Sequence, residues 1–150
     1  MDPAKPESRP ILPRAAVPLD SAGRLKALVV DGDDASRAFA AEALHSFAPG
    51  FDVATARDPQ QALAWIETFS PDLLVTDLRF SSGEMGSLRQ RLRAGEPARR
   101  CRVLVLSSLP TDDPMVESAR LESDAVLIKP IGLPYLLETV RKVMRLERSH

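Results

Sequence analysis

The stretch LKALVVD at residues 25–31 decides the fold of this 150-residue chain. Leu25–Val30 is a short apolar run, rich in β-branched residues, that stops at Asp31. A run of this length that is apolar except for Lys26 predicts a strand that is buried on both faces. Strands of this kind occur in parallel sheets that are covered by helices on both sides.

The same kind of run recurs along the chain, with amphipathic segments between the copies. The other predicted strands are Phe51–Thr55, Leu73–Thr76, Val103–Leu106 and Ala125–Ile128. The predicted helices are carried by Ala35, Phe39, Ala43 and Phe47; by Ala62, Trp65, Ile66 and Phe69 after an Asp58-Pro59 start; by Met85, Leu88 and Leu92; by the weakly periodic Thr111–Glu122; and by Leu136, Leu137, Val140, Val143 and Met144. We place Trp65 in the core and expect the last helix to end near Glu147. Strands alternating with helices predict an α/β fold with one doubly wound, five-stranded parallel sheet.

The composition of the chain excludes several classes of protein. Residues 1–24 alternate prolines with charges and show no apolar period, so we predict a disordered Pro-rich tail before a domain at residues 25–147. A net charge of −1 argues against general binding to nucleic acid or anionic lipid. No apolar stretch approaches the roughly 20 residues of a membrane span. The single cysteine, Cys101, excludes an intrachain disulfide and is interpreted as a small buried hydrophobe, which suits a cytoplasmic protein.

Polar residues follow the strands at the edge where such folds bind ligands. They are Asp31, Asp33 and Asp34 after the first strand, Asp77 after the third, Ser107 and Ser108 after the fourth, and Lys129 after the fifth. The carboxyl ends of parallel strands meet at one edge, so we expect these side chains to gather in one crevice. Carboxylates beside a lysine and a hydroxyl suit phosphoryl transfer to an aspartate, with a divalent ion relieving the repulsion between the acids.

Four segments resemble the signature segments of response-regulator receiver domains of two-component signalling: LVVD at 28–31, PDLLVTDL at 71–78, VLSS at 105–108 and IKP at 128–130. The resemblance covers about Leu25–Leu146 and implies a flavodoxin-like (βα)5 fold with strand order 2-1-3-4-5. It implies that Asp77 is the phosphoacceptor, Ser107 the switch hydroxyl and Lys129 the lysine of the site. It also implies a Mg²⁺ site formed by Asp31 and Asp77, with Asp33 and the backbone of Arg79 as further candidates.

The resemblance also implies a function and partners. A bacterial receiver is phosphorylated by a histidine kinase or a phosphotransfer protein and is not itself an enzyme. Because the last helix is predicted to end close to the C-terminus, we expect no output domain. Signalling would then use a downstream protein that binds the face of the predicted helix Thr111–Glu122, the strand Ala125–Ile128 and the last predicted helix, without direct DNA binding.

Three features depart from the family's pattern. Gly32 stands where relatives carry a second acid, which predicts weak Mg²⁺ binding. Asp33 or Asp34 either replaces that acid or caps the first helix, and we favour the cap. Val126 stands three residues before Lys129, where relatives often carry an aromatic residue. The loop after Asp77 lacks the usual proline and begins with Arg79, which is expected to pair with a neighbouring acid, cover the acyl phosphate or remain solvated.

The sequence is also compatible with two other functions. One is a phosphorylation-independent pseudo-receiver that only binds a partner, which Gly32 and Val126 favour. The other is a haloacid-dehalogenase-type phosphatase, because Asp31-Gly32-Asp33 resembles the Asp-x-Asp motif of those enzymes. The phosphatase is less favoured, because the acids after Lys129, Glu138 and Glu147, lie within a predicted helix.

Overall fold

The computed structural model describes residues 24–47, 50–80 and 101–145. Its centre is one five-stranded parallel sheet with the order β2-β1-β3-β4-β5. The strands are β1 (Leu25–Val30), β2 (Phe51–Ala56), β3 (Leu73–Asp77), β4 (Arg102–Ser107) and β5 (Ala125–Ile128). The predicted α/β class, the parallel sheet and the strand order are therefore confirmed.

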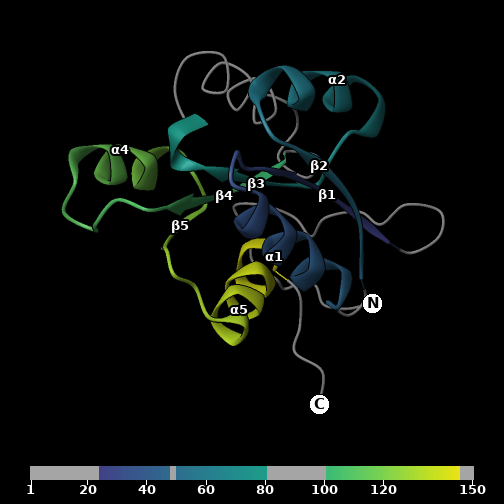
Figure 1. Ribbon diagram of the computed structural model, residues 1–150. Helices are drawn as coiled ribbons and strands as arrows, with labels where there is room; N and C mark the ends of the chain where they lie inside the picture. The colour runs from purple at the N-terminus through teal and green to yellow at the C-terminus, as the bar shows by residue number, and fades with distance from the viewer. Residues whose placement is uncertain (1–23, 48–49, 81–100, 146–150) are drawn as a thin grey trace, which may run out of the picture.

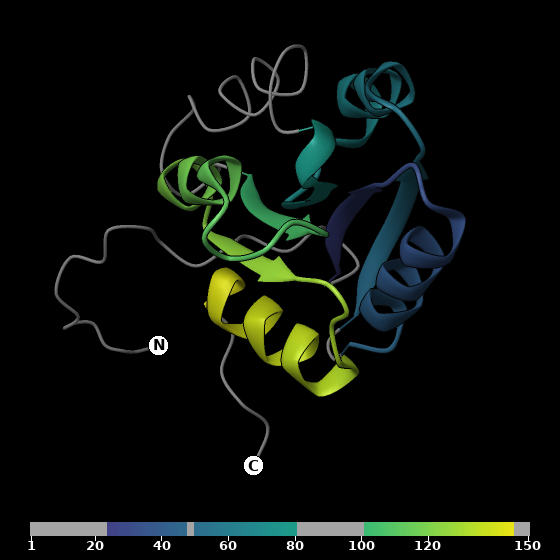
Figure 2. The ribbon, with the colours of Figure 1, turned by 60° about the vertical axis from the view of Figure 1, so that its left-hand side comes forward.

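Helices cover both faces of the sheet (Figure 1). The helices are α1 (Asp34–His45), α2 (Pro59–Phe69), α4 (Pro114–Glu122) and α5 (Leu133–Met144), and a short 3-10 helix, η1 (Leu78–Phe80), follows β3. Helices α1 and α5 pack on one face of the sheet, and α2 and α4 pack on the other (Figures 1 and 2). An apolar core therefore lies between the sheet and the helices on each face. The helix predicted around Met85–Leu92 and residues 1–23 of the predicted tail lie outside the described residues.

Aspartate side chains cap the N-termini of three of the described helices, α1, α2 and α4. The Asp58 carboxylate accepts from the Gln61 N–H and Pro59 follows at the first helical position, which confirms the predicted start of α2. Helix α4 begins at Pro114 and not at Thr111, because Asp113 is its cap. Helix α5 ends at Met144 instead of near Glu147.

The apolar stripe predicted for α1 is partly wrong. Ala43 and the following Phe47 are buried, but Ala35 and Phe39 are exposed, and Ala40 and Leu44 complete the buried face. A four-residue step turns an α-helix about 40° beyond a full turn. A stripe with that strict spacing therefore rotates away from the sheet along the helix.

The side chain of Trp65 also departs from its predicted place in the core. It is 41% exposed and meets the Phe69 ring edge-on at a centroid distance of 5.7 Å. Ala62, three residues earlier, is buried, so Trp65 lies at the rim of the apolar face of α2. An indole at such a rim is only partly covered. Cys101 is buried as predicted.

No helix among the described residues combines the length and the apolar character needed to cross a bilayer.

Candidate functional site

Four residues predicted for the site lie at the carboxyl ends of four adjacent strands. Asp31 directly follows β1, Asp77 ends β3, Ser107 ends β4 and Lys129 directly follows β5. Because every strand of the sheet runs in the same direction, these ends share one edge. Asp31, Asp77 and Ser107 are buried, and Lys129 is partly buried.

Lys129 joins the two buried acids. Its Nζ donates to Asp77 Oδ2 at 3.0 Å and to Asp31 Oδ2 at 3.1 Å. Burial lowers the pKa of the Lys129 ammonium, but the bonds to Asp77 and Asp31 outweigh it, and the pKa is raised. The lysine is therefore charged at neutral pH and balances one of the two negative charges.

Arg79 provides a second cation. Its main-chain N–H donates to Asp77 Oδ1 at 2.8 Å, its Nε lies 3.3 Å from the same oxygen, and its Nη2 lies 3.3 Å from Oδ2. The same Nη2 lies 3.8 Å from Asp31 Oδ1. Of the three alternatives for this residue, the ion pair with neighbouring acids is the one found.

The Asp77 carboxyl is held in its ionised form by these neighbours. Burial raises its pKa, but the backbone and side-chain hydrogen bonds from Arg79 and the bond and charge of Lys129 outweigh burial. The pKa of Asp77 is therefore lower than its ordinary value of 3.8. An ionised carboxylate is the form that can act as a nucleophile.

The Ser107 side chain is at this edge but does not contact the acids. Its hydroxyl accepts from the Leu109 N–H at 2.9 Å and donates to the Leu109 carbonyl at 3.0 Å. Within the described residues no side-chain hydrogen bond joins Ser107 to Asp77 or Lys129. The link to the lysine is through the backbone, where the Lys129 N–H donates to the Ser107 carbonyl at 2.7 Å.

Asp33 caps α1, as the favoured interpretation predicted. Its Oδ2 accepts from the Ser36 N–H at 2.8 Å, and that bond lowers the pKa of the Asp33 carboxyl. Its own N–H donates to Asp31 Oδ1 at 2.9 Å, so this turn also orients the Asp31 side chain. Arg37 supports the turn by donating from Nη1 to the Asp31 carbonyl, a contact that the sequence pattern did not reveal.

The residues present fit a divalent metal ion poorly. Asp31 and Asp77 are the two carboxylates at the centre of the site, and both already contact Lys129 and Arg79. Gly32 supplies no donor, and the Asp33 carboxylate is bound to the start of α1. Across the described ranges, no three Asp, Glu, His or Cys side chains are grouped so that they could hold a metal ion.

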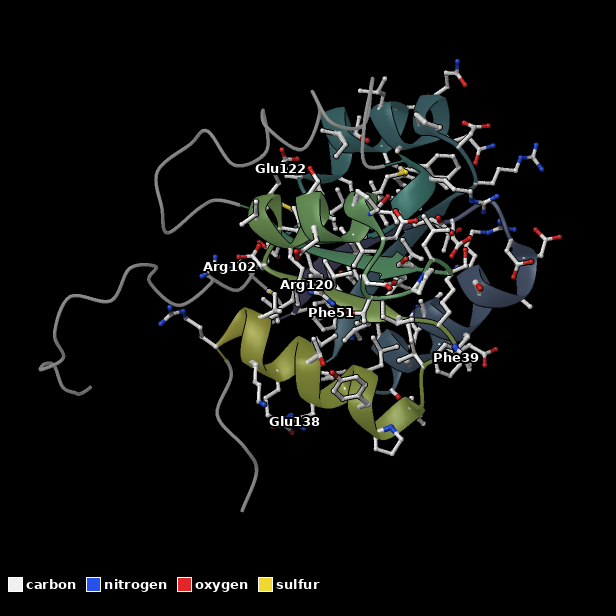
Figure 3. All side chains as sticks on the ribbon, turned by 90° about the vertical axis from the view of Figure 1, so that its left-hand side faces the viewer. Phe39, Phe51, Arg102, Arg120, Glu122 and Glu138 are labelled. Atoms are coloured by element: carbon white, nitrogen blue, oxygen red, sulfur yellow. The ribbon has the colours of Figure 1, made fainter. Side chains whose placement is uncertain are left out.

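An apolar hollow of about 430 Å³ adjoins the site. It is lined by Ala35, Ser36, Phe39, Leu106, Ser108, Lys129, Pro130 and Ile131. Phe39 is 37% exposed and lies at the surface of the molecule (Figure 3). The apolar period of α1 did not reveal this hollow, because it placed Phe39 on the buried face of the helix.

A family model and a curated relative match most of the chain. The model of the response regulator receiver domain matches residues 27–141. Over 124 residues the chain is 28% identical to a gliding motility regulatory protein of Myxococcus xanthus, covering 82% of this chain and 16% of that protein. The chain thus spans only a small part of that relative's length.

Solved structures of response regulators are also similar. A response regulator from Thermotoga maritima is 29% identical, with a TM-score of 0.66, covering 81% of this chain and 98% of that one. The chemotaxis response regulator CheY4 of Vibrio cholerae is 22% identical, with a TM-score of 0.64, covering 80% of this chain and 98% of that one. The similarity to CheY4 concerns the fold alone.

Proposed function

Because this chain belongs to the response regulator receiver domain family, whose members are signalling domains, we propose that it accepts a phosphoryl group on Asp77 from a histidine kinase or a phosphotransfer protein. The observation that carries the proposal is the position of Asp77. It is a buried, ionised carboxylate at the end of β3, and Lys129 lies 3.0 Å from its Oδ2. The family match also disfavours the phosphatase alternative.

The residues of the site can perform this transfer. An oxygen of the Asp77 carboxylate attacks phosphorus, and the bond from phosphorus to the donor breaks as the new P–O bond forms. The Lys129 ammonium already contacts the Asp77 carboxylate, so after the transfer it can bind the negatively charged phosphoryl oxygens. We propose that Mg²⁺ binds only weakly here, because Gly32 removes a donor and both acids already contact cations.

Ser107 provides a route from the site to the surface. If its hydroxyl turns to a phosphoryl oxygen of Asp77, the two hydrogen bonds to Leu109 break. Leu109 lies in the loop that leads into α4, so this loop changes its position relative to β4. We therefore propose that a downstream protein binds the face formed by α4, β5 and α5.

A second candidate is a partner-binding module that needs no phosphorylation. It is favoured by the two ion pairs that already neutralise Asp77 and by the half-buried Val126 on β5, which has no ring to reorient. Such a module would bind its partner equally well with Asp77 or with asparagine at that position.

The proposal is tested by mass spectrometry of the intact protein after treatment with acetyl phosphate and MgCl2. The wild type should gain one phosphoryl group. Asp77→Asn should gain none, because an amide cannot attack phosphorus. Asp33→Asn is the matched control, since it changes an acid at the same edge, keeps a residue type that caps helices and should be labelled like the wild type. Equal labelling of Asp77→Asn and the wild type would refute the assignment.

A further inference from the structure

Among the described residues, positive charge balances the two buried acids of this site. Asp31 and Asp77 contribute two negative charges, and Lys129 and Arg79, which contact both acids, contribute two positive ones. The cluster is therefore neutral without a metal ion. A divalent ion would add two charges to it and would compete with the guanidinium for Asp77 Oδ1.

Gly32 and Arg79 are adjacent in space. A Cβ atom added at Gly32 would lie 3.5 Å from Nη2 of Arg79 and 3.7 Å from the ring of Phe80, both ordinary contact distances. The start of a side chain at position 32 is therefore accommodated, and an acid there would begin next to a guanidinium. The absence of an acid at Gly32 and the presence of a base at Arg79 each make the site more positive by one charge.

Arg79 is held in place although its side chain is 61% exposed. Its main-chain N–H is bonded to Asp77 Oδ1 at 2.8 Å, which fixes the start of the side chain. The guanidinium carbon lies 5.8 Å from the centre of the Phe80 ring, a cation–π contact on a second side. An ordinary surface ion pair has no such supports.

We propose that Arg79 takes the place of a divalent metal ion between Asp31 and Asp77. The inference deepens the proposed function and rests on it for the phosphorylated state. In that state Arg79 and Lys129 together bind the phosphoryl oxygens, since a guanidinium suits two oxygens at once. Phosphorylation of Asp77 then needs no metal: with acetyl phosphate, the carboxylate oxygen forms the new P–O bond while the bond to acetate breaks and acetate leaves as an anion.

A metal titration tests the charge argument without any phosphoryl transfer. Mn²⁺ is titrated into the full chain, and the electron paramagnetic resonance signal of the free ion reports binding. The net charge of the cluster is 0 in the wild type, −1 in Arg79→Ala, −1 in Gly32→Asp and −2 in the double variant. We expect each single variant to bind Mn²⁺ at least tenfold more tightly than the wild type, and the double variant to bind most tightly.

Two further variants compare a positive charge that contacts the acids with one that does not. Arg79→Lys keeps the positive charge and should bind Mn²⁺ as weakly as the wild type. Arg57→Ala removes an exposed arginine whose carbonyl lies near Gly32. Among the described residues, Arg57 forms no ion pair with Asp31 or Asp77, so this variant should not gain Mn²⁺ affinity. Wild-type affinity within twofold of that of Arg79→Ala would overturn the proposal.

Labelling with acetyl phosphate tests the consequence for the reaction. Wild-type rates measured in EDTA and in MgCl2 should agree within threefold, whereas Arg79→Ala should depend strongly on MgCl2. Wild-type labelling that occurs only with MgCl2 would overturn the role of Arg79. Absence of labelling under both conditions would instead refute the proposed function, and the Mn²⁺ titration would still decide whether Arg79 excludes a metal.

Discussion

Replacing Lys129 by methionine removes the cation that joins the two buried acids of the site. Its Nζ lies 3.0 Å from Asp77 Oδ2 and 3.1 Å from Asp31 Oδ2. Methionine keeps most of the length and apolar volume of the side chain but has no charge. Among the described residues, the substitution therefore leaves two carboxylates, each 2% exposed, with Arg79 as the one cation in contact with both.

The expected cost follows from these distances. At an effective dielectric constant of about 20, each contact with Lys129 contributes roughly 5 kcal/mol of direct attraction. Desolvation of the three charges offsets most of this in the wild type. When one partner of a buried pair is removed, the cost of the unpaired charge remains, typically about 3–5 kcal/mol. Because Arg79 still contacts both acids, we expect a loss of about 3 kcal/mol in the free energy of unfolding at pH 7.5.

The loss should depend on pH with a definite sign. In the wild type the pKa of Asp77 is lowered, so its ionised form stabilises the fold above the ordinary pKa of 3.8, and this contribution disappears as the pH falls through the lowered value. In Lys129→Met the pKa of Asp77 should rise, because the cation that helps to lower it is missing. Protonation then relieves the repulsion between the acids as the pH falls, so the loss should be smaller at pH 5 than at pH 7.5.

Urea unfolding followed by far-ultraviolet circular dichroism at both pH values measures this effect. Lys142→Met, on the exposed side of α5, is the matched control and should change stability by less than about 0.5 kcal/mol. Asp31→Asn combined with Lys129→Met should recover at least about 1 kcal/mol, because one unpaired charge is gone. Equal stability of Lys129→Met and the wild type at pH 7.5, or a loss of the same size at pH 5, would refute the reasoning.

Three further outcomes are expected. Asp33→Ala should cost about 1 kcal/mol in urea unfolding, since the Ser36 N–H loses its acceptor, and an unchanged midpoint would contradict the cap. Ser107→Ala should also cost about 1 kcal/mol, because the Leu109 N–H loses its partner, and stability within error of the wild type would show that water replaces the hydroxyl. On phosphorylation of Asp77, amide chemical shifts should change most in α4, in the loop before it and around the start of α5, whereas changes confined to β2 and α2 would place the output on another face.

Much of the fold could be predicted because its signals are local. The bounds of β1 and β5 agree with the apolar runs. Strand β1 is almost wholly buried, and a strand of that kind has few polar residues until it leaves the sheet. The parallel arrangement then predicts that Asp31, Asp77 and Lys129 meet, and their side chains do make contact. An aspartate before a proline likewise predicted where α2 begins.

Tertiary structure decided what these side chains contact. The exposure of Phe39 and Trp65 depends on how far each helix is rotated against the sheet, which an apolar period defines only to within tens of degrees. The Ser107 hydroxyl has donors and acceptors on several sides, and its bonds to Leu109 follow from the path of the next loop.

The ion pairs of Arg79 are the clearest case. The chain alone showed a long, flexible cation two residues after an acid, with three possible environments. Its place between Asp31 and Asp77 depends on the turn after another strand, where the Asp31 carboxylate lies 3.8 Å from the Arg79 guanidinium. Sequence by itself determined which chemical groups reach this edge of the sheet, because strands that alternate with helices predict a parallel sheet whose carboxyl ends share one edge. Which charges then pair depends on distances of a few ångströms between residues far apart in the chain, and only the packed structure sets those distances.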